Sequence, residues 1–186
     1  MAEDDADATT GGGGSSAGGP SDPSAAEQLA ADEAAFHRYG AELAELVAAA
    51  LPGWVERSVA GVLTEQGIEV TGAIRAEATA SGAAARDDVG PRLRALLAAD
   101  LDEQATGPLA LLREAVRYPT EVLVAAGAQP VPRDDFDERA FPGDLYALAP
   151  AAFGDLDEAL AEPGIRWGAA KAYVHLARRR GAADGR

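Results

Sequence analysis

Apolar side chains recur at helical spacing along residues 24–50, and this pattern constrains the fold more than any other feature of the chain. Leu29, Phe36, Leu43 and Ala50 follow one another at intervals of seven residues, which places them on one face of a long helix. No stretch shows the alternating, β-branched pattern of a pair of strands. The sequence therefore predicts an all-α protein.

Proline and glycine divide this chain of 186 residues into about six predicted helices, packed as an irregular bundle. The helices are expected near residues 24–50, 54–67, 69–87, from 91 onward, 108–127 and 164–180. Proline lacks a backbone donor and clashes with the preceding turn. We therefore expect helices to be interrupted at Pro52 and Pro91, and a kink or break at Tyr118-Pro119.

Composition also predicts how the chain is divided. Residues 1–23 are rich in Gly, Ser and Asp and lack apolar periodicity, so a disordered tail is expected there. Residues 24–180 are expected to form a single helical domain. Within it, residues 128–163 form a long, proline-rich acidic arm before the last helix, and residues 181–186 are predicted to be a disordered C-terminus.

The charge of the chain argues against several classes of partner. The formal net charge is −15, which opposes binding to nucleic acid and to anionic lipid. No leader peptide or uninterrupted apolar run is evident, so we expect a cytoplasmic protein without a nucleic-acid or membrane partner. The absence of cysteine excludes disulfides and thiolate metal sites. Lys171 is the only lysine, a composition typical of GC-rich genomes such as those of actinobacteria.

The arm contains a candidate interaction surface. Four acids fall within residues 134–138, and the arm as a whole has nine acids and two arginines, whereas residues 163–186 have a net charge of +5. We expect the aromatic rings of the arm to pack on the helices with its acids outside. The arm then either completes the fold or presents, together with the last helix, a surface to a partner. The candidate residues are Asp134, Asp135, Phe136, Asp137, Glu138, Phe141, Trp167, Lys171 and His175; Tyr146 and Phe153 are expected to help hold the arm down.

The last helix carries two apolar stripes and one mixed face. Ile165, Ala169, Ala172 and Leu176 form one stripe, and Trp167, Ala170 and Val174 form a second one beside it. Trp167, Lys171 and His175 follow at intervals of four, with Trp167 as the expected anchor and Lys171 extending its amine toward water.

Carboxylate pairs offer an alternative, enzymatic interpretation. Glu42 and Glu45, with Asp100 and Glu103, have the spacing that small helical nucleotide or phosphate hydrolases use to bind Mg²⁺. Asp134, Asp135 and Glu138 likewise have the spacing of the aspartate-rich segment of helical isoprenoid synthases, although the second motif of those enzymes is absent. Such pairs also occur on ordinary solvated helix faces.

No other catalytic set emerges from the sequence. Neither His37 nor His175 has the Glu-x-x-His spacing of a di-iron bundle. Without a convergent set, the sequence favours a non-enzymatic interaction or regulatory protein with an unidentified protein partner and no cofactor. Whether the chain is an enzyme, and its oligomeric state, are left open by the sequence.

Two segments within residues 118–180 carry a resemblance. YPTEVLVAAGAQPVPRDDFDERAFPGDLYALAP and EPGIRWGAAKAYVHLARRR resemble uncharacterised small all-helical proteins of high-GC Gram-positive bacteria. The resemblance implies an all-helical fold and brings no activity, cofactor or site residue with it.

Overall fold

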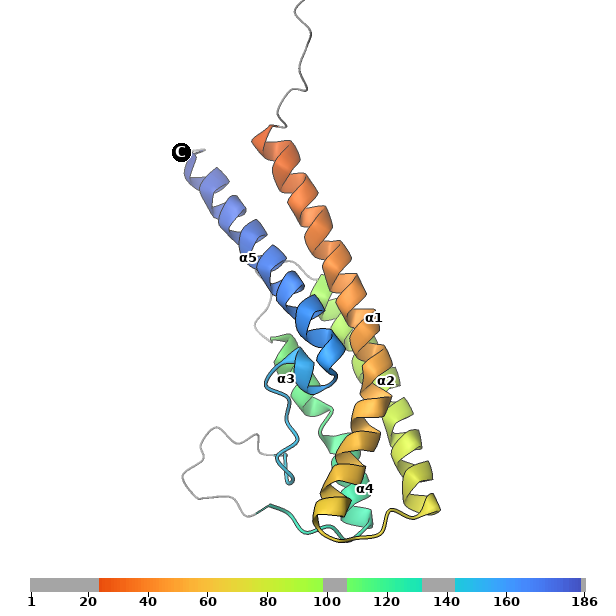
Figure 1. Ribbon diagram of the computed structural model, residues 1–186. Coiled ribbons are helices and arrows are strands. Elements are labelled where there is room, and N and C mark those ends of the chain that lie inside the picture. The colour runs from red at the N-terminus through yellow and green to blue at the C-terminus, as the bar shows by residue number, and fades with distance from the viewer. Residues whose placement is uncertain (1–23, 99–106, 132–142, 185–186) are drawn as a thin grey trace, which may run out of the picture.

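The computed structural model describes residues 24–98, 107–131 and 143–184. In these ranges the chain is helical without strands, so the predicted all-α class is confirmed (Figure 1). The elements are α1 (Ala25–Glu65), α2 (Gly72–Ala98), α3 (Pro108–Glu114), α4 (Arg117–Ala125), the short 3₁₀ turns η1 (Phe153–Asp155) and η2 (Glu158–Leu160), and α5 (Ala161–Asp184). The predicted tail at 1–23 and the acidic cluster at 134–138 lie outside the described residues.

The longest helix, α1, is the element on which the others pack. It contacts α2, α4 and α5, and α2 also contacts α3 and α4. Figure 1 shows α5 running antiparallel to the N-terminal half of α1, while α2 and α4 lie beside its C-terminal half. The beginning of α1 and the end of α5 therefore lie at the same end of the molecule, beyond the end of α2.

The expected count of about six helices is not matched, because two predicted interruptions do not occur. Pro52 lies inside α1 and Pro91 lies inside α2. Each proline removes a helical hydrogen bond, but buried side chains such as Leu51 and Val55 hold both sides of Pro52 in the core. Tertiary packing thus keeps each helix continuous where local propensity alone favours a break.

The interruption expected at Tyr118-Pro119 lies earlier in the chain. Helix α3 ends at Glu114 and α4 begins at Arg117. Pro119 is then in the first turn of α4, where a missing N–H costs nothing because the first N–H groups of a helix have no partner within it. A break between α3 and α4 at this point therefore places Pro119 where a helix tolerates proline best.

The helix ends are closed by local hydrogen bonds. Ser24 and Glu27 form a capping box at the start of α1, with the Ser24 N–H donating to the Glu27 carboxylate at 2.8 Å. This bond is the main cause of the lowered pKa of Glu27. At the other end, Gly67 has φ of 69°, and the N–H of Ile68 donates to Leu63 O at 2.9 Å, as in a glycine-terminated helix.

A second glycine-terminated end lies beside the first. Gly127, with φ of 79°, ends α4 in the same way, since the N–H of Ala128 donates to Leu123 O at 3.0 Å. The Gln66 side chain then joins the two helix ends. Its amide donates to Gln129 O and accepts from the Gln129 N–H, both at 2.8 Å.

The described part of the arm is packed on the helices. Tyr146, Leu156 and Leu160 are buried, and the Tyr146 hydroxyl donates to Ala128 O at 3.1 Å. The buried Asp144 carboxylate accepts backbone N–H groups from the same turn, including that of Ala149. The expected docking of the arm through its rings is confirmed for Tyr146 and Phe153, whereas Phe136 and Phe141 lie outside the described residues.

Two further findings concern the ends of the fold. Helix α5 continues to Asp184, four residues past the predicted domain end at residue 180. Within the described ranges, α1 is also the one helix long and apolar enough by composition to span a membrane, although charged residues interrupt its apolar sequence. A third of its most apolar 18-residue stretch is buried within the protein, and both core helices and signal sequences meet the same criterion.

Candidate functional site

Trp167 fixes α5 to the body of the protein. Its ring is buried, stacks on Phe36 with centroids 6.2 Å apart, and meets Phe153 edge-on at 6.3 Å. Gly40 makes this approach possible, because a Cβ added there would lie 3.4 Å from Trp167 Nε1 and 3.0 Å from Leu97 O. Trp167 is therefore the anchor of the last helix, as expected from the sequence.

Two ion pairs set the rotation of α5 against α1. Arg166 Nη2 lies 2.9 Å from Glu42 Oε1, and Arg178 Nε lies 2.8 Å from Glu33 Oε1. The Arg166 guanidinium also lies over the Tyr39 ring, 5.0 Å from its centroid. Partly exposed pairs of this kind contribute about 0–1 kcal/mol each, so they orient the helix more than they stabilise the fold.

The opposite side of α5 is an exposed apolar surface. Ile165, Tyr173 and Leu176 are 74%, 56% and 46% exposed, and the alanines between them, Ala169 and Ala172, are exposed as well. We call these five residues the outer face. At 100° per residue they lie diametrically opposite the buried stripe that contains Trp167 and Val174. Of the two predicted stripes, one faces the core and the other faces solvent.

The three residues of the predicted mixed face differ in exposure. Trp167 is buried and His175 is exposed, with Lys171 partly buried between them. Lys171 Nζ lies 5.4 Å from the centroid of the Trp167 ring, and burial lowers the pKa of its amine. The remaining candidate interaction residues, Asp134 to Glu138 and Phe141, are not among those described.

The carboxylates of the alternative metal site point to different neighbours. Glu42 pairs with Arg166 of α5, whereas Glu45 accepts from Arg94 Nε of α2 at 3.0 Å. Asp100 and Glu103 fall in the segment that the structure does not describe. Among the residues that it does describe, no three His, Asp or Glu side chains are grouped to hold a metal ion. Glu42 and Glu45 thus act as links between helices.

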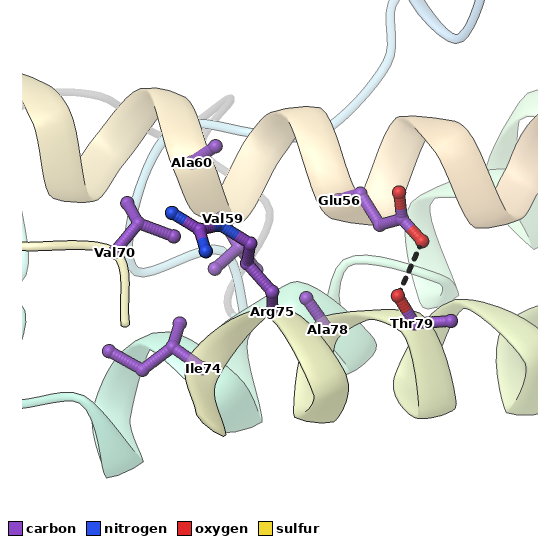
Figure 2. A pocket seen from close by; sticks show the side chains of 8 residues that line it. All are labelled: Glu56, Val59, Ala60, Val70, Ile74, Arg75, Ala78 and Thr79. Atoms are coloured by element: carbon purple, nitrogen blue, oxygen red, sulfur yellow. Dashed lines mark hydrogen bonds between the residues drawn. The ribbon is translucent and has the colours of Figure 1, made fainter. Parts of the chain in front are cut away.

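A small pocket lies between α1 and the beginning of α2 (Figure 2). Its volume is about 280 Å³, and its walls are mostly apolar, with Val59, Val70 and Ile74 among them. Figure 2 shows Arg75 extending from α2 toward α1, while Glu56 accepts a hydrogen bond from Thr79 at 2.8 Å. The lining holds no histidine, and its one hydroxyl, that of Thr79, is paired with Glu56 alone, without a third described group that orients this carboxylate as a base.

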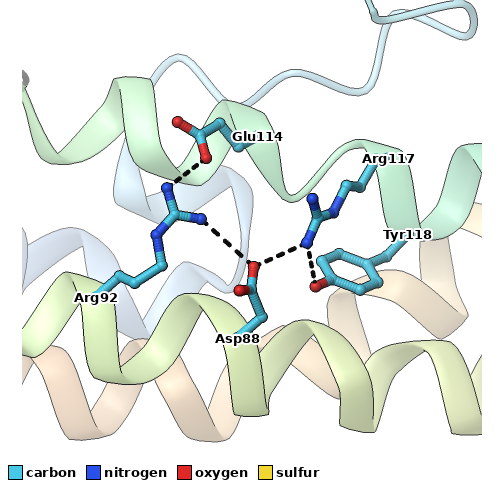
Figure 3. A network of polar contacts seen from close by, with 5 residues as sticks. All are labelled: Asp88, Arg92, Glu114, Arg117 and Tyr118. Atoms are coloured by element: carbon cyan, nitrogen blue, oxygen red, sulfur yellow. Dashed lines mark hydrogen bonds and ion pairs between the residues drawn. The ribbon is translucent and has the colours of Figure 1, made fainter.

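A polar network joins α2 to α3 and α4 (Figure 3). Asp88 accepts from Arg92 at 3.4 Å and from Arg117 at 3.0 Å. Arg92 also donates to Glu114 at 2.6 Å, and Arg117 donates to the Tyr118 hydroxyl at 2.8 Å. These bonds raise the pKa of both arginines. Each charged member already has a partner, so the network holds the helices together and leaves no group poised for chemistry.

Sequence reasoning identified the stripe of Ile165 and Leu176 but did not recognise that it faces solvent. The pocket was missed altogether. Its only signal was the sparse pattern of Val70 and Ile74, which left the surface between α1 and α2 incompletely filled. No family model matches this chain, and no curated protein and no solved structure is significantly similar to it.

Proposed function

We propose that this chain is a non-enzymatic cytoplasmic protein that acts by binding another protein, and that the outer face of α5 is its binding surface. The supporting observation is the exposure of Ile165, Tyr173 and Leu176 on a helix whose other side is already buried. Single exposed apolar residues are ordinary, but a contiguous apolar surface is typical of a protein contact. An amphipathic helix normally has one apolar stripe, so a second stripe indicates a second packing partner.

The alternative, a Mg²⁺-dependent nucleotide or phosphate hydrolase, has less support. Mg²⁺ requires several oxygen ligands at about 2.0–2.1 Å around one point. Glu42 and Glu45 are instead engaged by arginines of two different helices, α5 and α2. No observation on the described residues favours a reacting centre over a binding surface.

The proposal is tested by placing charge on the outer face. Ile165→Glu combined with Leu176→Glu should abolish the co-purification of partner proteins from host cells that also express a differently tagged copy of the chain, because a buried, unpaired carboxylate is costly in an interface. Val124→Glu is the matched control, since Val124 is 56% exposed but lies on α4. The expected result is loss of the same proteins with the outer-face variant and their retention with the control.

Two results would contradict this function. One is a set of co-purifying proteins that the outer-face variant leaves unchanged. The other is Mg²⁺-dependent hydrolysis of nucleotides by the purified protein that Glu42→Gln eliminates. Circular dichroism of each variant checks that the helices are intact, which is expected because every substituted side chain but Glu42 is an exposed apolar one.

A further inference from the structure

We infer that the outer face of α5 binds a second copy of this chain, as an antiparallel pair of α5 helices. This inference rests on the proposed function, and it names the partner. It follows from the spacing of the apolar residues on the outer face and from the charged residues at its two ends. Both sets are complementary to themselves in the same antiparallel register.

The spacing of the outer face is that of a helix–helix seam. Ile165, Ala169, Ala172 and Leu176 are separated by four, three and four residues, the alternation of the two apolar positions in a coiled coil. The two central residues are alanines, which let a second helix approach closely. A seam of this kind is completed by another helix with the same period.

The seam is complementary to itself when reversed. If Ile165 of one copy lies opposite Leu176 of the other, Ala169 lies opposite Ala172, and the two-fold axis passes between residues 170 and 171. Each large side chain then contacts a large one, and each alanine contacts an alanine. The two-fold axis repeats both kinds of pair, so each occurs twice. A two-fold symmetric dimer requires such a self-complementary surface.

The charges at the ends fit the same register. One step beyond Ile165 along the seam is Glu162, and one step beyond Leu176 is Arg179; both are exposed. In the reversed pair, Glu162 of each copy lies opposite Arg179 of the other. Among the described residues neither side chain has an ion-pair partner of its own. They are seventeen residues apart on one helix, about 25 Å at 1.5 Å per residue, so they cannot pair within one copy.

Exchange of these charges tests the inference, with sedimentation over a concentration series as the measurement. Wild type should form a dimer, and Glu162→Arg or Arg179→Glu alone should raise the dimer dissociation constant about tenfold by opposing like charges. An equimolar mixture of the two variants should recover association, because each heterodimer regains both opposite-charge pairs. Ile165→Glu should abolish the dimer.

Matched controls separate local pairing from overall charge. Glu69→Arg and Arg75→Glu make the same charge changes at exposed positions away from α5, and should leave the wild-type dimer essentially unchanged. A wild type that remains monomeric, a dimer that survives Ile165→Glu, or a mixture that associates no better than its components would overturn the inference. If the wild type is monomeric but the outer-face variant still loses co-purifying proteins, the proposed function stands and only the identity of the partner is wrong.

Discussion

At the scale of single residues, close helix packing depends on glycines at crossing points. Gly82 of α2 faces Pro52 of α1, and a Cβ added to Gly82 would lie 2.8 Å from Pro52 Cα and 2.9 Å from Pro52 O. Both of those atoms belong to the backbone, so no side chain can move aside. At this crossing the two helices therefore pack with their backbones in direct contact.

Gly82→Ala should therefore destabilise the protein by about 1–3 kcal/mol, the cost of overpacking, even though alanine favours a helix by about 1 kcal/mol. Gly61→Ala is the control, because Gly61 lies in α1 with nothing within 4 Å of an added Cβ. That substitution should stabilise by roughly 0.5–1 kcal/mol. The shift of the urea midpoint measures both effects, and equal midpoints for the two variants would refute this view of the crossing.

At the scale of elements, the sequence predicted helix type well and helix limits less well. The seven-residue recurrence from Leu29 to Ala50 identifies α1, and Gly67 and Gly127 mark helix ends as expected. The predicted helix ends at Pro52 and Pro91 were wrong. Residues on both sides of each proline are buried in the folded molecule, and the local sequence does not reveal this burial.

The candidate site was predictable only in part, for a related reason. The two stripes of α5 are visible in its periodicity, but which of them faces the core depends on Phe36 and Gly40 of α1, which are far away in the sequence. Trp167, Lys171 and His175 run from the core to the surface because residues four apart are offset by 40° around the helix with each step.

The described part of the arm behaves as an element of the core, and Tyr146 tests this. Tyr146→Phe should cost about 1 kcal/mol near neutral pH through loss of the bond to Ala128 O. Burial raises the pKa of Tyr146 above its usual value of 10.0. The folded state therefore keeps this proton where the unfolded state loses it, and stability falls as pH rises from about 10 through the raised pKa.

The free-energy difference between wild type and Tyr146→Phe should accordingly shrink as pH increases above about 10. Denaturant unfolding at several pH values measures it. Tyr39→Phe serves as the comparison, because Tyr39 lies on α1, away from the outer face, and its hydroxyl has no hydrogen-bond partner among the described residues. The stability of this variant should change with pH as that of wild type does. A gap for Tyr146→Phe that stays constant up to strongly alkaline pH would show that the ring is not buried in solution.

At the scale of the whole molecule, the arrangement leaves one helix incompletely covered. Helix α1 contacts other helices along its length, whereas α5 lies at one edge and uses only its inner stripe (Figure 1). A second copy on the outer face would place two α5 helices between two α1 helices, in a layered four-helix contact. The net charge of −15 opposes non-specific association between copies of the chain. The stability of the dimer must therefore come from the specific contacts along the seam.

The most direct measurement of this arrangement is the distance between two spin labels, one on each copy. The chain contains no cysteine, so Arg180→Cys provides a single labelling position near the end of α5. In the antiparallel register the two labelled residues are nineteen positions apart along the axis, about 28 Å, and electron–electron double resonance should give a distance near or somewhat above that value. A separation near 10 Å, as in a parallel pair, or the absence of any dipolar coupling would contradict the pairing of α5 with itself.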